Sequence, residues 1–417
     1  MSARRGRGDD RDVGGHSKVT GQRVLGFERP NLLDDLKNIL HEYPDNEQIF
    51  KEMLQNAEDA RATTVKIVSV SESTSLHEPP TKKHKGDKSS SWRPPFAKVL
   101  QMPGLCVYND ALFTEDDWLG IRKLHASVKV KDPLKVGRFG LGFKSVFHLT
   151  DHPIIISGPH LLFMDPFREE REAIYMTSLD DLDREEWNTL GGALKPLLRL
   201  LDKDSLADKD FKGTIFWFPL RQTPSELSKT VYSQQRVQQL KQAFRSEIST
   251  MLLFLKRLEK VEAFSADGES QSSVPTLDFS VELSGGCVAA VRASREKFLS
   301  GITTRDKLCP QQEVIVSSHL EVKVVRAVAG GVERDEEHWL VVHYHQGTDD
   351  MSSQLSGLCQ RKYLTHRPYV GVAAKLNSLS PDFQGQLFCF LPLPPETPSP
   401  TGLPVHVHGF FELSQNR

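Results

Sequence analysis

One stretch decides the fold: Glu52-Met53-Leu54-Gln55-Asn56-Ala57-Glu58-Asp59-Ala60. It lies in a predicted helix that runs from about Asn46 to Ala60. Side chains four apart on a helix share a face, and the next turn continues the same row, so Glu52, Asn56 and Asp59 project together. A carboxylate one turn from a carboxamide can activate a water molecule while the amide oxygen binds Mg²⁺. The alternative is a solvated polar helix face.

A second polar pair, Asn109-Asp110, ends a predicted strand in Gly104-Leu105-Cys106-Val107-Tyr108-Asn109-Asp110-Ala111. A carboxylate at a strand end can accept a hydrogen bond from an exocyclic amine such as that of adenine. Asn-Asp is also common in turns, so a turn remains the alternative.

The third motif is rich in glycine: Lys135-Val136-Gly137-Arg138-Phe139-Gly140-Leu141-Gly142-Phe143-Lys144-Ser145-Val146-Phe147. Its glycines allow the backbone to approach an anion closely, and a helix expected from Phe143 would point N–H groups at that anion. It is not a Walker A loop, because Phe143 intervenes before Lys144. It is not a dinucleotide fingerprint, because Ser145 replaces the third glycine. A structural turn is the alternative.

A fourth position, Thr214 after Gly213, opens a predicted strand. Its hydroxyl could hold a water molecule beside a bound base, although threonine is frequent in strands.

Hydrophobic periodicity places further elements around these motifs. A helix is expected over Leu32–Leu40, stopped by Tyr43-Pro44-Asp45, and a long amphipathic helix over Gln234–Phe264. Strands are expected at Val65–Val70, Ala97–Leu100, Leu105–Tyr108, Ile154–Ile156, Thr214–Phe218, Leu320–Val325, Trp339–His343 and Val405–Phe411, with helical character in Asp180–Asp210.

Composition shifts divide the chain into three parts. Residues 1–20 are predicted to be a disordered basic tail. Residues 21–265 form the first domain, with a low-complexity insertion at 71–95, and residues 266–417 form a second, smaller α/β region. The chain stops soon after a predicted strand, which suggests a fragment of a longer protein.

The overall charge is nearly balanced. The 53 basic and 55 acidic residues of the 417 give a formal net charge of −2 and no general reason to expect nucleic acid or a membrane as partner. Five scattered cysteines without a CxxC pattern favour a reducing compartment and buried thiols. Because the sequence has neither a secretory signal nor an apolar run of about 20 residues, a cytoplasmic location is expected, with the nucleus as the alternative.

The order and spacing of the motifs resemble those of the GHKL ATPases, the superfamily that includes Hsp90, gyrase B and MutL. Within it the sequence is most similar to the sacsin-type (Sacsin/Nov) group. The resemblance spans roughly Gly21 to Arg417 and rests on Gly21-Gln22-Arg23, Ile39–Pro44, Gln55–Ala60, Tyr108–Ala111, Val136–Ser145, Leu403–His406 and Gly409–Phe411.

This resemblance implies an α/β (α+β) two-layer sandwich of the Bergerat type that uses ATP and Mg²⁺. Glu52 would be the general base, Asn56 the Mg²⁺ ligand, and Thr114–Val136 the ATP lid. The implied nucleotide contacts are Asn56, Asp59, Asn109, Asp110, Gly137, Phe139, Gly140, Leu141, Gly142, Phe143 and Thr214. The implied partners are protein clients and Hsp70-type chaperones, in a dimer or a larger multi-repeat chain. Neither a membrane nor nucleic acid is expected as a partner.

One motif departs from the family pattern. The adenine box usually reads Asp-x-Gly-x-Gly, but here Ala111, Leu112 and Phe113 replace the glycines. Either Asn109 or Asp110 falls at the adenine position. Two functions therefore stay open: a slow chaperone-like ATPase, and a nucleotide-free pseudo-ATPase that acts as a protein-interaction scaffold. A DNA-associated relative or a kinase has less support, because no helix carries a phospho-accepting histidine and no basic surface is expected beyond the tail and the insertion Ser71–Pro95.

Overall fold

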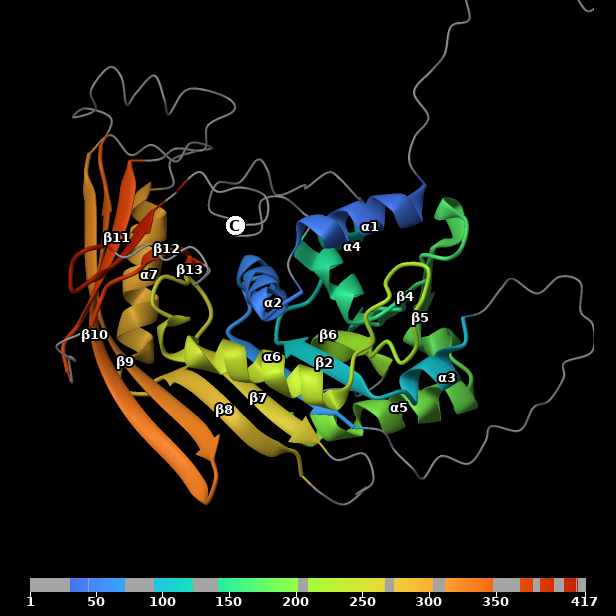
Figure 1. Ribbon diagram of the computed structural model, residues 1–417. Helices are drawn as coiled ribbons and strands as arrows, with labels where there is room; N and C mark the ends of the chain where they lie inside the picture. Colours follow the sequence, from blue (N-terminus) through green and yellow to red (C-terminus); the bar gives the residue numbers. More distant parts are fainter. Residues whose placement is uncertain are drawn as a thin grey trace, which may run out of the picture.

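The computed structural model describes residues 31–43, 45–71, 94–122, 142–201, 209–266, 274–302, 312–347, 368–377, 383–393, 401–409 and 411. Their strands form one mixed 14-stranded sheet, in the order β13-β12-β14-β11-β10-β9-β8-β7-β1-β2-β6-β3-β4-β5 (Figure 1). None of the helices in these ranges is both long enough and apolar enough to cross a membrane. The predicted tail, residues 72–93 of the predicted insertion and residues 123–136 of the predicted lid lie outside the described ranges.

The strands of the sheet are β1 (Thr64–Val70), β2 (Gly104–Asn109), β3 (Ile154–Gly158), β4 (His160–Met164), β5 (Ile174–Ser178), β6 (Phe211–Pro219), β7 (Lys260–Ala266), β8 (Thr276–Leu283), β9 (Val314–Val328), β10 (Gly331–His345), β11 (Tyr369–Lys375), β12 (Leu387–Cys389), β13 (Leu391–Pro392) and β14 (His406–Gly409). The α-helices are α1 (Leu32–Glu42), α2 (Gln48–Asp59), α3 (Phe96–Leu100), α4 (Glu115–Ile121), α5 (Arg184–Leu198), α6 (Gln234–Ser246) and α7 (Val288–Ile302). Short 3₁₀ segments include η2 (Gly142–His148) and η6 (Ile248–Thr250).

Helices cover both faces of the first half of the sheet. Alternate residues of β1 and β2, such as Val65 and Val107, pack in one cluster with α1, α2, η2 and α6. The residues between them, such as Cys106, pack in a second cluster with α3 and α5. The expected two-layer arrangement is therefore wrong for this half, because α3 and α5 add a third layer. Every residue of β2 is buried, which requires cover on both sides.

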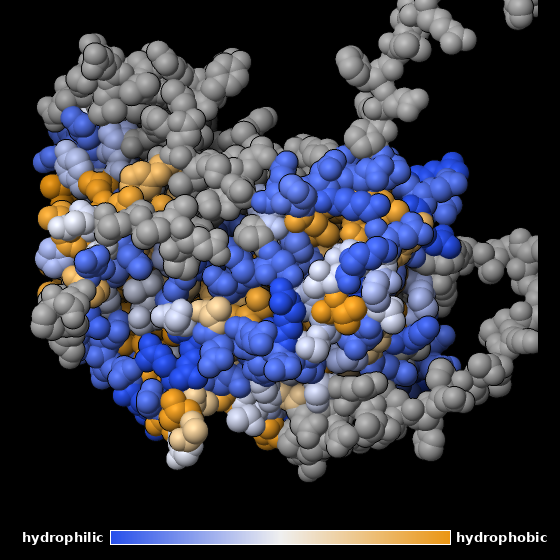
Figure 2. All heavy atoms as spheres, viewed as in Figure 1, coloured by the Kyte–Doolittle hydropathy of each residue, from blue (hydrophilic) through white to orange (hydrophobic). Residues whose placement is uncertain are grey.

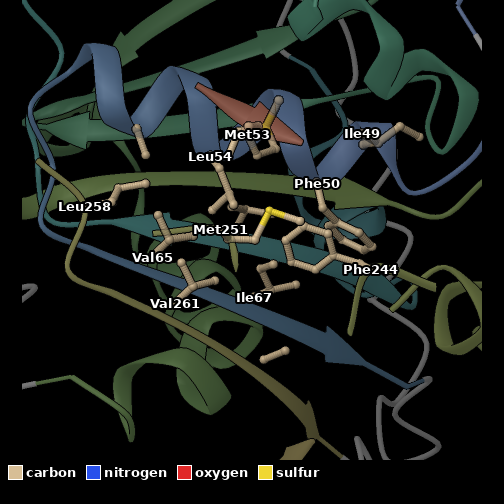
Figure 3. Close-up of a cluster of buried hydrophobic side chains, with 14 of the residues drawn as sticks. Ile49, Phe50, Met53, Leu54, Val65, Ile67, Phe244, Met251, Leu258 and Val261 are labelled. Carbon is tan, nitrogen blue, oxygen red and sulfur yellow. The ribbon is translucent and has the colours of Figure 1, made fainter. Parts of the chain in front are cut away.

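Helix α2 lies at the centre of the first cluster (Figure 3). Nine of its twelve residues are buried. Its apolar side chains pack against β1, α6, β7 and the segment before β7; the contacting residues labelled in Figure 3 are Ile49, Phe50, Met53, Leu54, Val65, Ile67, Phe244, Met251, Leu258 and Val261. This packing fixes the rotation of α2 and therefore decides which of its side chains remain accessible.

The sheet continues across the expected domain boundary at 265/266. Strand β7 lies parallel to β1, and β8 pairs antiparallel with both β7 and β9. In the second half, α7 packs against β9 (Figure 1). One sheet thus joins the two predicted regions, while their division into separately folding units stays a prediction.

Most predicted elements are confirmed, and two are wrong. Ala97–Leu100, expected as a strand, belongs to helix α3, where Val99 and Leu100 are buried. The preceding Pro94-Pro95 pair suits a helix start. The long helix expected over Gln234–Phe264 ends at Ser246 and is followed by η6 and β7. Residues 251–255 are all buried, and a surface helix cannot hide five consecutive side chains.

The described surface is mainly hydrophilic on the face shown in Figure 2, where hydrophobic side chains lie in small groups. The three cysteines within the described ranges, Cys106, Cys287 and Cys389, are buried free thiols, as expected. Burial raises the pKa of the Cys106 thiol far above its usual value, so this thiol stays protonated.

Candidate functional site

Helix α2 has one partly open row of side chains. Its nine buried residues leave only Glu52, Asn56 and Asp59 partly exposed. These are the three residues that the helical spacing places on a common face. An accessible polar row on an otherwise buried helix is unusual, because a solvated surface helix would bury only one stripe.

Glu52, at the N-terminal end of this row, contacts the glycine-rich motif at Gly142. A Cβ added to Gly142 would lie 1.7 Å from Oε2 of Glu52 and 2.5 Å from its carboxyl carbon. The carboxylate therefore lies directly on the backbone of Gly142, and a larger residue at this position would force the Glu52 side chain to move. Two motifs that are 90 residues apart in the sequence are thus adjacent in space. Gly137, Phe139, Gly140 and Leu141 lie outside the described residues.

Asn109 and Asp110, the polar pair at the end of β2, have different surroundings. Asn109, 3% exposed, pairs with Val65 of β1 and with Thr214 of β6, so its side chain lies on the face covered by α2. The carboxylate of Asp110 instead accepts hydrogen bonds from the backbone N–H groups of Thr63 (2.8 Å) and Thr64 (3.1 Å). Of the two candidates for the adenine position, only Asn109 shares a face with the open row of α2.

Hydroxyl groups next to Asn109 hold the segment that follows β2. Thr214, 1% exposed, donates its proton to the carbonyl of Ala111 (2.7 Å). Its oxygen can then accept from Ser157 Oγ (2.8 Å), and that hydroxyl accepts from the backbone N–H of Phe113 (2.9 Å). Asn109 Oδ1 also accepts from the N–H of Ala111 (3.0 Å). The row Asn109–Thr214–Ser157 therefore fixes the loop from Ala111 to Phe113 that follows β2.

Gly213 allows this close arrangement. It has φ of +134°, and a Cβ there would lie 2.6 Å from both the carbonyl oxygen of Asn109 and the ring of Tyr108. A larger residue would push β6 away from β2 at the level of Thr214.

Aromatic rings fill the sheet face beside this row. Phe143, predicted as a nucleotide contact, is 7% exposed, and its ring centroid lies 5.7 Å from that of Phe216. Phe113 lies 5.9 Å from the same ring and 4.8 Å from Trp118 of α4. The side chain of Phe143 therefore belongs to the core.

A buried arginine, Arg221, fixes the segment that follows Gly142. It is 3% exposed, and it donates to the carbonyls of Phe147 (2.6 Å) and His148 (2.8 Å) and to the carboxylate of Asp151 (2.8 Å). The guanidinium thus satisfies carbonyls at the end of η2 that have no partner within the segment. Sequence reasoning missed Arg221, because most of its partners are backbone carbonyls and only Asp151 is a side chain.

Lys144 links the glycine-rich segment to α4. Its ammonium group donates to the carbonyl of Ile121 (2.9 Å), and burial lowers its pKa to about 8. Lys144 therefore joins the last described turn before residues 123–141 to the first described turn after them.

A second acidic side chain of α2, Glu58, has a structural role that the sequence did not reveal. Glu58 is 2% exposed, and its carboxylate accepts hydrogen bonds from the backbone N–H groups of Lys256 (2.7 Å), Arg257 (3.1 Å) and Leu258 (3.0 Å). It anchors the end of α2 to the segment before β7. In the Gln55–Ala60 motif, Asn56 and Asp59 thus face the open side, while Glu58 holds the helix in place.

We expect Glu58→Gln to lower the free energy of unfolding by about 1–3 kcal/mol, because the amide NH₂ group would face three N–H donors. Urea unfolding followed by circular dichroism measures this loss. The matched control is Glu333→Gln on the exposed part of β10, which should change stability by less than about 0.5 kcal/mol. Equal effects of the two substitutions would contradict this role for Glu58.

Arg295 of α7 ties the second half of the chain to the same segment. It donates to the carbonyls of Leu258 (3.0 Å) and Leu252 (2.9 Å). The pKa of its guanidinium is lowered, because the effect of burial exceeds the opposite effect of the Glu58 and Glu259 carboxylates. The position of α2 therefore depends on contacts from both halves of the sheet.

The fold and the site together define a mixed α/β protein in which a row of polar side chains on helix α2 faces one side of a long sheet. Comparison with known proteins adds its family: residues 29–277 match the sacsin domain, and the chain belongs to the sacsin domain family. It is 36% identical to human sacsin over 415 aligned residues, which cover 96% of this chain but only 9% of sacsin. A solved structure described as the N-terminal domain of a DNA repair protein aligns with 90% of this chain and 86% of its own, at 10% identity and a TM-score of 0.35.

Proposed function

We propose that this chain binds Mg-ATP as a GHKL-type module with the Bergerat fold and hydrolyses it slowly to drive chaperone-like interactions. One observation carries the proposal: the only partly exposed side chains of α2 are Glu52, Asn56 and Asp59, and this row meets Gly142. The same sheet face presents Asn109 at a strand end. The resemblance of these motifs to the GHKL pattern supplies the ligand.

The residues present fit such a ligand. The amide oxygen of Asn56 would hold Mg²⁺, which prefers oxygen ligands. Glu52 would accept a proton from an attacking water molecule. Gly142 carries no side chain, so phosphate oxygens could approach its backbone once the flexible Glu52 carboxylate had rotated away from it. Asn109 Oδ1 has a second lone pair besides the one used by Ala111, and it could accept from the adenine amine. When bound, Mg²⁺ would supply charge neutralisation for the phosphates.

The second candidate is a nucleotide-free scaffold with the same fold. Asn109 favours it, because a neutral amide stands on the face where the family uses a carboxylate. The contact between Glu52 and Gly142 also favours it, because the carboxylate lies where phosphate would approach. In either case we propose protein clients and an Hsp70-type chaperone as partners, from the sacsin resemblance alone.

Calorimetric titration of the full chain with Mg-ATP separates the two candidates. The ATPase proposal expects saturable binding that Asn56→Ala weakens by about 10- to 100-fold, the loss of one charge-assisted contact of about 1.5–3 kcal/mol. Glu333→Ala should bind like the unaltered chain. A chain that is folded by circular dichroism and yet binds no Mg-ATP would establish the scaffold instead.

A further inference from the structure

We propose that His319, Glu321 and His338 form a site for a borderline divalent cation of the Zn²⁺ type. The three residues lie on β9 and β10 in the second half of the sheet. One potential ligand atom from each lies within 4.8 Å of those of the other two. None of them takes part in the nucleotide site proposed above, and all lie beyond the residues that match the sacsin domain.

Strand register brings the three side chains together. His319 and Glu321 are two apart on β9 and therefore point to the same side of the sheet. His338 of β10 is directly opposite Glu321 of β9 in the antiparallel ladder. His319 is the diagonal neighbour of His338. The two imidazole rings lie 5.6 Å apart between centroids, at 31° to each other. His319 and Glu321 of β9 and His338 of β10 thus lie close together on one face of the sheet.

The backbone that carries these side chains is fixed from the opposite face of the sheet. Leu320 and Trp339, each adjacent to a proposed ligand, are 1% exposed and belong to the main core. The N–H of His338 donates to Oδ1 of Asn377 (2.9 Å), which joins β10 to the end of β11. Since both strands are also paired on their outer edges, a cation would need only side-chain rotation to bind.

The donor set determines the class of cation. Two imidazole nitrogens and one carboxylate oxygen suit Zn²⁺ and its neighbours Co²⁺, Ni²⁺ and Cu²⁺. Ca²⁺ and Mg²⁺ prefer oxygen ligands throughout. Three protein ligands leave a tetrahedral ion one position for water or for a ligand from a partner. On the same face, Lys323 lies two residues beyond Glu321 on β9, and its cross-strand neighbours are Glu282 of β8 and Glu336 of β10. These two carboxylates outweigh the one ammonium group, so the neighbouring charges do not oppose a cation.

Zinc titration of the full chain by calorimetry tests this proposal. We expect saturable Zn²⁺ binding that His319→Ala and His338→Ala each weaken by at least about 10- to 100-fold, since even changes to outer-shell partners of metal ligands have effects of that size. Co²⁺ should give a visible absorption band that both variants lose. His41→Ala, at an exposed histidine of α1, should bind both ions like the unaltered chain.

A second measurement connects binding to this face. Zn²⁺ should raise the thermal unfolding midpoint of the unaltered chain through mass action, but not that of the His319→Ala, His338→Ala double variant. Circular dichroism checks that the double variant is folded. Equal Zn²⁺ affinity in the double variant and the unaltered chain, or no binding by either, would overturn the proposal. Neither result bears on ATP binding at α2.

Discussion

Replacing Glu52 by glutamine is expected to reduce ATP hydrolysis by about 10²- to 10⁴-fold, the usual contribution of a positioned general base. The amide keeps the shape of the carboxylate and its place on Gly142, but it cannot accept a proton from water. Binding of Mg-ATP should change much less, because Asn56 and the glycine backbone are unaltered. The signature is therefore a loss of turnover with nearly unchanged affinity.

Single-turnover measurements with excess protein give the clearest test of the Glu52 variant. Conformational steps such as lid closure or dimerisation often gate ATP hydrolysis, and a steady-state rate would include those steps. Glu333→Gln is the matched control for the loss of one carboxylate. Turnover by Glu52→Gln equal to that of the unaltered chain would exclude Glu52 as the base, even if Mg-ATP binds.

The sequence predicted the elements with strong periodicity. Helix α1, helix α2 and strand β1 show clear helical or alternating patterns, and their bounds agree to within about two residues. The segment Gln234–Phe264 was wrongly predicted as one helix, because an amphipathic helix and a buried non-helical segment both carry frequent apolar residues. The third layer was missed for a related reason: a strand buried on both faces reads as a continuous apolar run and does not show what covers it.

The site was predictable only where one element carries the pattern. The row Glu52, Asn56 and Asp59 follows from helix geometry alone. The choice between Asn109 and Asp110 depends on strand register and on contacts of Asp110 with Thr63 that only the folded chain reveals. Glu58 and Arg221 could not be found from sequence, because they bind mainly backbone groups, which no residue type marks, and Asp151, the acidic partner of Arg221, lies 70 residues away in the chain.

Stability should fall in mild acid because of two histidines in the second half of the chain, the buried His406 and the half-buried His343. Burial, together with the nearby positive charge of Arg295, lowers the pKa of His343 to about 4, and burial together with Lys375 lowers the pKa of His406 to about 4. In the unfolded chain both should titrate near the usual value of about 6.5. Between these values the unfolded state binds more protons, so the contribution is complete above about pH 6.5 and is lost as pH falls towards 4.

Each histidine should account for about 3 kcal/mol at the acid end of this range, and for about 2 kcal/mol at pH 5. Both rings use Nδ1 next to a donor: His343 lies 2.9 Å from the Tyr369 hydroxyl, and His406 accepts from the N–H of Gln386 at 3.0 Å. Burial also raises the pKa of Tyr369, which keeps that hydroxyl protonated as the donor. Protonation of His406 would therefore remove a hydrogen bond as well as bury a charge, whereas the Nδ1–H of a protonated His343 could still donate to the Tyr369 oxygen.

Urea unfolding of the full chain between pH 7 and pH 5 measures this loss. His343→Gln and His406→Gln should each remove their own share, about 2 kcal/mol of the difference between the two pH values, whatever they do to stability at pH 7. His41→Gln, at an exposed position, should leave the pH dependence unchanged. A comparison of slopes is needed because carboxylates elsewhere also titrate and contribute equally to every variant. If both buried variants kept the full pH dependence, the acid sensitivity would have to come from those carboxylates, and the two histidines would contribute only packing.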